Sequence, residues 1–140
     1  MKITVMIDMG EDFTKYIIKE IQPWLEKNIN KDRLVSAQNY VAIEPKYKSI
    51  YTPIINLYFF SLACYAIIKV RKYSQFYELY FDEEAIVYGT NIRSIELINL
   101  INYGNMTVTP YPIFTEMFDY FNQNIEEIYQ EYLSSLEEGE

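Results

Sequence analysis

The chain has 140 residues, half of them hydrophobic, which fits a single compact domain because folded domains typically hold roughly 100 to 200 residues. It has no His and a single Cys, Cys64, so its composition excludes a Ser-His-Asp triad, a Cys-His dyad, a zinc site and an internal disulfide. The formal net charge is −8, and from Ser94 onward the chain has nine acids and no base, which excludes binding to a phosphate backbone through that third.

The first third of the chain predicts a strand followed by a helix. Alternating apolar residues predict a strand over 2–8. Asp12 is a good N-cap for a helix over 13–30, whose apolar residues recur at helical spacing. Pro23 should kink or restart that helix. The polar span 30–48 has apolar runs too short to predict an element.

The stretch 49–68 carries no charge over 20 residues, which is long enough to span a bilayer. Pro53 and Asn56 interrupt it, its three tyrosines are spread through it, and the basic residues on both flanks specify no orientation. We therefore expect a buried helix over 54–64, opened by Pro53 and followed by a strand. A small membrane-associated protein that uses 49–68 is kept as an alternative.

The middle of the chain predicts an antiparallel meander. Three strands are expected over 66–72, 76–82 and 85–88, separated by short polar turns. Helical spacing returns over 92–103. Gly104 follows that helix at the place where a left-handed C-terminal cap is needed.

The last predicted element is an amphipathic helix over 113–133, whose apolar stripe is almost heptad-regular. Phe118, Phe121 and Ile125 belong to this stripe and should pack against the sheet. An alternative is that the stripe forms a seam for another subunit.

Together these elements predict the fold class α+β, in which a small mixed or antiparallel sheet packs with an N-terminal helix and a C-terminal amphipathic helix. We expect one such domain over 1–133 and an acidic C-terminal tail over 134–140.

Few residues suggest chemistry. Glu83 and Glu84 form a carboxylate pair, as do Asp8 and Asp12, yet acids at a turn are usually solvated, and no apolar pocket that would shift their pKa is evident. Cys64 has apolar neighbours, which raise the pKa of a thiol and leave it inert. The four glycines lie too far apart to cradle a phosphate. We predict no catalytic, cofactor-binding or metal-binding residues, and a protein that is not an enzyme.

A resemblance appears near the C-terminus. The segment 95–105 reads as a short helix that ends in an aromatic-Gly step, and a proline-containing loop through 110–114 leads into the last helix. This arrangement resembles the closing module of tail-completion (neck, head-to-tail connector) proteins of long-tailed bacteriophages. By motif the resemblance covers 95–132. Asn105 and Tyr111 stand where that family commonly has a Thr and a basic residue.

The resemblance implies a viral structural protein without enzymatic activity. Such a subunit would form a homo-oligomeric ring, commonly a hexamer, between the connector and the tail tube or terminator. It would be made in the host cytoplasm and end in the neck or tail of the virion. Gly104, Pro110 and Pro112 would be structural residues of the module.

The charge asymmetry predicts how neighbouring copies would meet. The basic middle of one copy could pair with the acidic last helix of the next, with Tyr and Phe burying apolar area between them. The candidate interface residues are Lys69, Arg71, Tyr111, Glu116, Asp119, Glu126 and Glu127. The alternative is that these acids only form a solvated helix face.

A third class of function fits the same composition. An acidic protein without recognisable motifs could mimic nucleic acid and block the basic groove of a host defence factor. Chromatography with light scattering, with and without detergent, separates a ring from a soluble monomer or dimer and from a membrane-associated protein.

Overall fold

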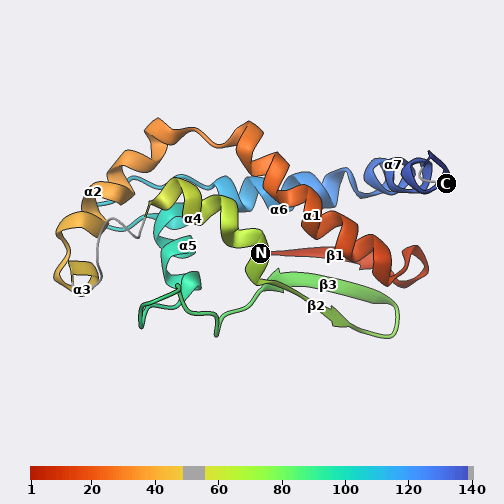
Figure 1. Cartoon of the computed structure of the whole chain (residues 1–140), viewed down its shortest axis with the longest axis horizontal. Helices are drawn as coiled ribbons and strands as arrows, with labels where there is room; N and C mark the ends of the chain where they lie inside the picture. The colour runs from red at the N-terminus through yellow and green to blue at the C-terminus, as the bar shows by residue number, and fades with distance from the viewer. Residues whose placement is uncertain (49–55, 139–140) are drawn as a thin grey trace.

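The structure is a computed structural model that describes residues 1–48 and 56–138. The strands are β1 (Lys2–Met6), β2 (Ile68–Lys72) and β3 (Phe76–Phe81). The α-helices are α1 (Glu11–Asn28), α2 (Val35–Ile43), α3 (Pro45–Lys48), α4 (Leu57–Ala63), α5 (Ser94–Tyr103), α6 (Ile113–Gln123) and α7 (Ile125–Glu138). Short 3-10 turns cover Ile7–Met9, Lys31–Leu34 and Cys64–Ile67. Helices therefore fill the polar span for which the sequence predicts no element, and the fold is α+β (Figure 1).

The three strands form one antiparallel sheet with the order β1-β3-β2. Leu79 at the centre of β3 lies between Ile3 of β1 and Val70 of β2. The predicted meander is wrong in its third strand, because 85–88 forms no strand and only Ile86 makes an isolated bridge, to Arg93. On the side away from β2, β3 pairs with β1. The buried residues Ile3 and Val5 of β1 lie opposite the buried residues Leu79 and Tyr77 of β3.

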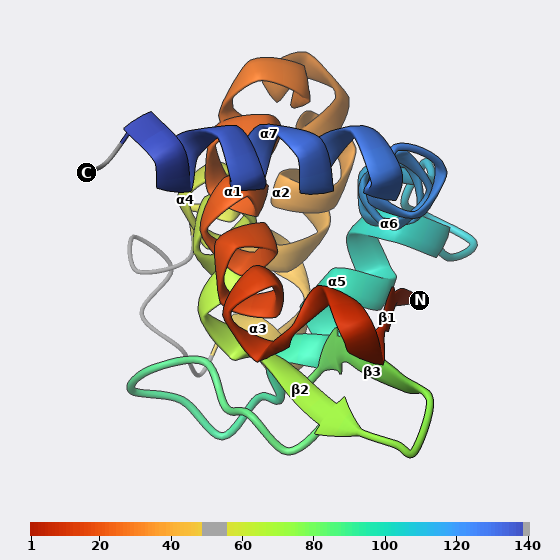
Figure 2. The ribbon, with the colours of Figure 1, turned by 90° about the vertical axis from the view of Figure 1, so that its right-hand side faces the viewer.

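The inner face of the sheet packs under the helices. Alternate residues of β1 and β3 are buried on it, namely Ile3, Val5, Tyr77, Leu79 and Phe81, whereas β2 buries only Ile68. Helix α6 contacts β1, and its Phe118 ring meets the Phe81 ring edge-on at 5.2 Å between centroids. Helix α1 contacts β3 (Figure 2). The opposite face carries charged and polar residues, such as Lys2, Arg71 and Glu78, together with Met6 and Phe76 near one end.

Helix α1 is one continuous element. It begins after Gly10, so Asp12 lies in its first turn and is not the N-cap that the sequence predicts. The helix passes through Pro23 without restarting. Its buried stripe consists of Phe13, Ile17, Ile21 and Leu25, spaced by four residues as expected for one helix face.

The predicted single helix over 113–133 is wrong, because Asn124 divides it into α6 and α7. The Asn124 side chain donates to the Tyr120 carbonyl at 2.8 Å, and its own backbone N–H donates to the same oxygen at 3.0 Å. An Asn side chain that competes for a helix carbonyl favours the end of a helix. Phe118 and Phe121 are buried on α6 as expected, whereas Ile125 is only partly buried on α7.

Helix α7 leaves the line of α6 and crosses the beginning of α1 (Figure 2). Phe13 of α1 packs there against Tyr129 and Tyr132, with ring centroids 5.0 and 5.3 Å away. The helix continues to Glu138, so 134–138 of the expected acidic tail are helical.

The uncharged stretch 49–68 lies partly outside the described residues, and so do Pro53 and the predicted start of its helix. In the described part, α4 begins after Asn56, whose side chain accepts from the Tyr58 N–H at 3.0 Å as an N-cap. A 3-10 turn then leads into β2. Within 1–48 and 56–138, no helix combines the length and the apolar character needed to cross a membrane.

Candidate interaction surface

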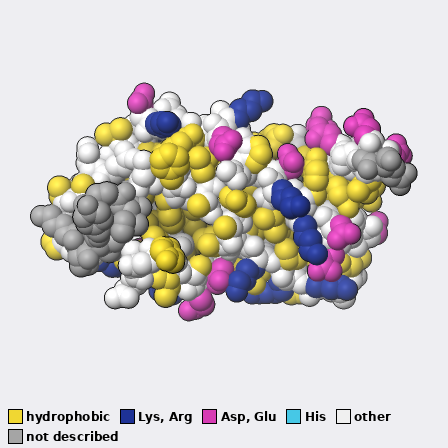
Figure 3. Space-filling view, viewed as in Figure 1, with side chains coloured by type: hydrophobic (Ala, Val, Ile, Leu, Met, Phe, Trp, Pro, Cys, Tyr) yellow, Lys and Arg dark blue, Asp and Glu magenta, His cyan; other side chains and the backbone are white. Residues whose placement is uncertain are grey.

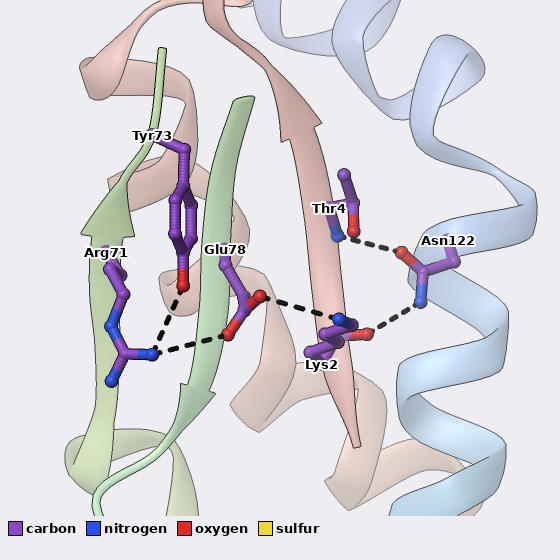
Figure 4. Close-up of polar contacts among 6 residues, drawn as sticks. All are labelled: Lys2, Thr4, Arg71, Tyr73, Glu78 and Asn122. Atoms are coloured by element: carbon purple, nitrogen blue, oxygen red, sulfur yellow. Dashed lines mark hydrogen bonds and ion pairs between the residues drawn. The ribbon is translucent and has the colours of Figure 1, made fainter. Parts of the chain in front are cut away.

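One edge of the sheet is closed by a side chain from the far end of the chain. The backbone groups of Thr4 and Lys2 point outward from β1, because the residues between them pair with β3. Asn122 of α6 meets both: its Oδ1 accepts from the Thr4 N–H at 3.0 Å, and its Nδ2 donates to the Lys2 carbonyl at 2.8 Å (Figure 4). The β1 edge is therefore protected from pairing with another strand.

The other edge of the sheet, along β2, is open. The Tyr73 N–H donates to the Phe76 carbonyl at 2.8 Å. Hydrogen-bonded pairs alternate along an antiparallel ladder, so Arg71 and Lys69 also direct their backbone groups toward β3. The backbone groups of the residues in between point away from the sheet, on Ile68, Val70 and Lys72. The Ile68 N–H donates to the Tyr65 carbonyl, whereas in the part of the chain that the structure describes nothing hydrogen-bonds to the outward backbone groups of Val70 and Lys72. An open edge of this kind is a template for another strand.

The outer face of the sheet carries a charge cluster around Glu78 at the centre of β3. Its carboxylate lies 3.6 Å from the Lys2 ammonium and 3.9 Å from the Arg71 guanidinium, and its side chain is 14% exposed (Figure 4). Arg71 also donates to the Tyr73 hydroxyl at 3.3 Å and lies over the Tyr80 ring at 4.5 Å. These contacts hold Arg71 in one orientation at the open side of the sheet.

A second ion pair joins Lys69 of β2 to Asp82, with 3.1 Å between Nζ and Oδ2. The Asp82 carboxylate also accepts from the Glu84 N–H at 3.0 Å. This backbone hydrogen bond, followed by the contact with Lys69, lowers the pKa of Asp82. The turn after β3 is therefore tied to the basic strand beside it.

An open cleft of about 700 Å³ lies between this outer face, helix α5 and the turn after β3. Lys2, Lys69 and Arg71 line it together with acids of β3 and the turn, so cations and anions alternate along it. Among the described residues, no group of His, Cys, Asp and Glu is arranged to hold a metal ion. The cleft offers polar contacts to a partner's surface.

The residues weighed for chemistry lie in three separate places. Glu83 and Glu84 lie at the rim of the cleft, and Asp8 lies in the turn after β1 with Asp12 in the first turn of α1. Cys64 is buried, its thiol donates to the Phe60 carbonyl at 3.2 Å, and burial raises its pKa well above the usual range.

The candidate acids of the last third lie on the surface of two helices. Glu116 and Asp119 are exposed on α6, and Glu126 and Glu127 are exposed in the first turn of α7. No described cation forms an ion pair with any of them. Acidic side chains gather at the right-hand end over α7, and basic ones lie along the lower edge, where β2 and β3 run (Figure 3).

Tyr111 is a core residue, which corrects its assignment to the interface. It is 3% exposed, its hydroxyl accepts from the Asn30 N–H at 2.9 Å, and the Arg33 guanidinium lies 4.0 Å from its ring centroid. Tyr111 lies in the proline-containing loop that the sequence predicts. Its hydroxyl links this loop to the segment that follows α1. The other six candidate interface residues are exposed or, for Lys69 and Arg71, more than half exposed in their side chains.

The loop from α5 to α6 contains Gly104, Pro110 and Pro112, the three residues that the resemblance implies to be structural. Gly104 ends α5 with a φ of +65° and donates to the Leu100 carbonyl at 3.0 Å. Asn105 then accepts from two loop N–H groups with its side chain. Pro110 follows in that loop, and Pro112 is the residue before the first turn of α6.

Asn102 is a residue that the sequence reasoning missed. It is 1% exposed on α5, and its Oδ1 accepts from the N–H groups of Phe114 and Thr115, both at 3.1 Å. Its Nδ2 donates to the Thr115 hydroxyl at 2.8 Å. Pro112 stands at the N-cap position and has no side-chain hydrogen-bonding group, so a neighbouring helix caps α6. The only signal in the sequence is a polar residue within an apolar helix stripe.

These features locate two unlike surfaces on one chain: an open, basic edge at β2 and an acidic face over α6 and α7. No protein-family model matches the chain, and no curated protein or solved structure matches it either.

Proposed function

We propose that the protein is a structural subunit without enzymatic activity that assembles with copies of itself into a ring, at the head-to-tail junction of a long-tailed bacteriophage. The observation that carries the proposal is the asymmetry of the sheet. Asn122 closes the β1 edge, whereas the β2 edge is open and basic, and the unpaired acids lie elsewhere on the same chain. A closed ring needs two unlike, complementary surfaces on each subunit, because each subunit contacts one neighbour through the first surface and the other neighbour through the second.

The charges of the β2 edge suit an acidic neighbour. Lys72 is exposed and forms no ion pair with any described residue. The side chains of Lys69 and Arg71 are 59% and 53% exposed, so each can bind a second carboxylate besides Asp82 and Glu78, with which they pair in the same chain. Charged contacts of this kind set register and association rate, and the apolar area between them supplies affinity.

The phage assignment is supported by the resemblance of 95–132 to the closing module of tail-completion proteins. In such a ring the neighbours along the axis are the connector and the tail tube or terminator. The subunit would act in the neck or tail of the virion.

Light scattering coupled to chromatography tests the proposal through Val70→Pro. Because the Val70 N–H points outward, it can donate to a carboxylate on the acidic face of the neighbouring copy; proline there removes this donor and leaves the ladder with β3 intact. We expect the variant to lose assembly and to keep its melting temperature within a few degrees. Val70→Thr is the matched control, since it keeps the N–H.

A charge test addresses the same contact. Lys72→Glu should weaken assembly without breaking an ion pair inside the subunit, and Glu126→Lys with Glu127→Lys should partly restore it. Raised salt should also weaken assembly, because it screens the charges.

The outcomes separate the function classes. A chain that stays monomeric at all concentrations contradicts the ring and favours the acidic inhibitor, whereas dependence on detergent favours the membrane-associated protein. Assembly indifferent to both Val70→Pro and salt would show that another surface joins the copies.

A further inference from the structure

A groove of about 340 Å³ lies where α7 turns away from α6 and passes α1. One wall is aromatic: Trp24 of α1 and Tyr120 of α6 have ring centroids 5.7 Å apart, with planes tilted by 35°. Tyr120 is 41% exposed. Phe121 and Ile128, both buried, form its apolar base. The groove therefore offers an accessible aromatic face above an ordered apolar base.

Two carboxylates from different helices border this aromatic wall. Glu20 of α1 and Glu131 of α7 both line the groove. After burial, the charges of these two residues are the causes that raise the pKa of Tyr16, so they converge on one side of α1. Neither forms an ion pair with any residue in the described ranges. Lys27 is the one cation among the lining residues that the structure describes.

We propose that this groove binds an arginine side chain presented by a basic segment of a partner protein. A planar guanidinium can stack on Trp24 and Tyr120 while it donates to the Glu20 or Glu131 carboxylate. A Lys ammonium has no planar face to stack, so it would use only part of the site. The surrounding last third of the chain has nine acids and no base, which attracts a basic segment.

The partner differs from a second copy of this chain. The chain has three arginines, and two of them already lie over tyrosine rings of their own fold: Arg33 is 4.0 Å from the Tyr111 centroid and Arg71 is 4.5 Å from that of Tyr80. Arg71 can therefore meet a neighbour's carboxylate with its edge while its face stays on Tyr80, but it would have to leave that ring to stack in the groove, as Arg33 would have to leave Tyr111. The third arginine, Arg93, has no other basic residue near it in the sequence and so is not part of a basic segment. The groove is distinct from the β2 edge of the ring proposal. It shares the helices α6 and α7 with the acidic face of that proposal, but Glu116, Asp119, Glu126 and Glu127 do not line it.

Trp24 is the only tryptophan of the chain, so its fluorescence reports occupation of the groove directly. The probes are acetyl-Gly-Arg-Arg-Gly-amide and two matched peptides, one with lysine and one with citrulline in place of arginine. We expect a saturable change in Trp24 emission with the arginine peptide, binding weaker by about fivefold or more with lysine, and no saturation with neutral citrulline.

Variants assign the binding to the groove. Glu20→Gln with Glu131→Gln should weaken arginine-peptide binding by about tenfold or more. The matched control is Glu126→Gln with Glu127→Gln, which removes the same charge outside the groove and should change binding less than about twofold. Lys27→Gln should tighten binding, because it removes the opposing cation. Circular dichroism melting checks that each variant is folded.

Three results would overturn the inference. Equal losses in the groove pair and in the control pair would mean general charge attraction, and equal binding of lysine and arginine would remove the stacked guanidinium. A change in Trp24 emission with the protein's own concentration, in the absence of peptide, would make a second copy the occupant. Val70→Pro should leave peptide binding unchanged, so failure of the ring and failure of the groove can be told apart.

Discussion

Gly104 shows how much one residue decides in the loop between α5 and α6. Its φ is +65°, and a Cβ there would lie 2.4 Å from the Val108 carbonyl oxygen and 2.9 Å from the Pro110 nitrogen. We predict that Gly104→Ala destabilises the protein by more than the roughly 1 to 3 kcal/mol of a strained backbone conformation alone. Urea denaturation measures the loss.

Gly89→Ala is the matched control for this prediction. Gly89 also has a positive φ, of +78°, but a Cβ there would have nothing within 4 Å. It should show the conformational cost without the steric one. Equal losses at Gly89 and Gly104 would mean that the contact with the loop backbone contributes nothing.

Asn102 is the second residue on which the same loop depends. Asn102→Ala leaves the buried Phe114 N–H and the neighbouring Thr115 N–H without their acceptor, so we predict a loss of about 1 to 3 kcal/mol in the free energy of unfolding. Asn99→Ala on the same helix is the control, because that side chain is exposed and should cost well under 1 kcal/mol. Comparable losses in the two variants would argue against a capping role.

At the scale of the element, α6 is the helix that joins the sheet to the helical layer. Phe121 is 2% exposed on its inner face. We predict that Phe121→Ala lowers the free energy of unfolding by about 3 to 5 kcal/mol, from lost burial and the cavity left behind. Tyr120→Ala, one residue away and 41% exposed, is the control and should cost much less. A Phe121→Ala monomer that melts like the wild type yet fails to assemble would instead make this stripe an intersubunit seam.

Elements with a clear local period could be predicted from the sequence. The alternation of β1 and β3 and the four-residue spacing in α1 predict these elements to within a few residues. An element that buries one face has apolar residues at the period of that face, and this period is visible in the sequence. The pairing of β1 with β3 could not be predicted, since it joins segments about 75 residues apart in the register of Ile3 with Leu79. The break at Asn124 was hidden because the apolar stripe continues across it.

The candidate surfaces could be predicted in part for the same reason. Exposure of Lys69, Arg71 and the acids of α6 and α7 follows from their charge alone. The roles of Asn122 and Asn102 could not be foreseen, because a single amide side chain has no period and its partners lie in other elements. Tyr111 was misplaced for the opposite reason: a tyrosine in a loop gives no sign of whether its ring is buried.

For the whole molecule, the uneven charge predicts opposite effects of salt on folding and on assembly. The unpaired acids of α6 and α7 repel one another within one subunit, so screening them should stabilise the monomer. We predict that sodium chloride raises the melting temperature of the Val70→Pro monomer by a few degrees, about what 1 kcal/mol produces in a domain of this size. The same salt should weaken assembly of the wild-type chain.

Neutralising part of the acidic face provides the check. In a Val70→Pro background, Glu126→Gln with Glu127→Gln should reduce the salt effect on melting. A melting temperature that falls with salt would mean that the attractive ion pairs of the sheet outweigh the repulsion over the helices.

The bond between Asn122 and the Lys2 carbonyl spans 120 residues of chain, and this has a consequence for synthesis. At the usual rate of about 5 to 20 residues per second, a ribosome that has added Lys2 needs roughly 6 to 24 s more to reach Asn122. The strand that leaves the ribosome first therefore waits for β3 to give it a neighbour and for α6 to seal its edge. During that interval β1 is an unpaired strand with alternating apolar side chains, so it is a segment that a chaperone would have to protect until its partners are made.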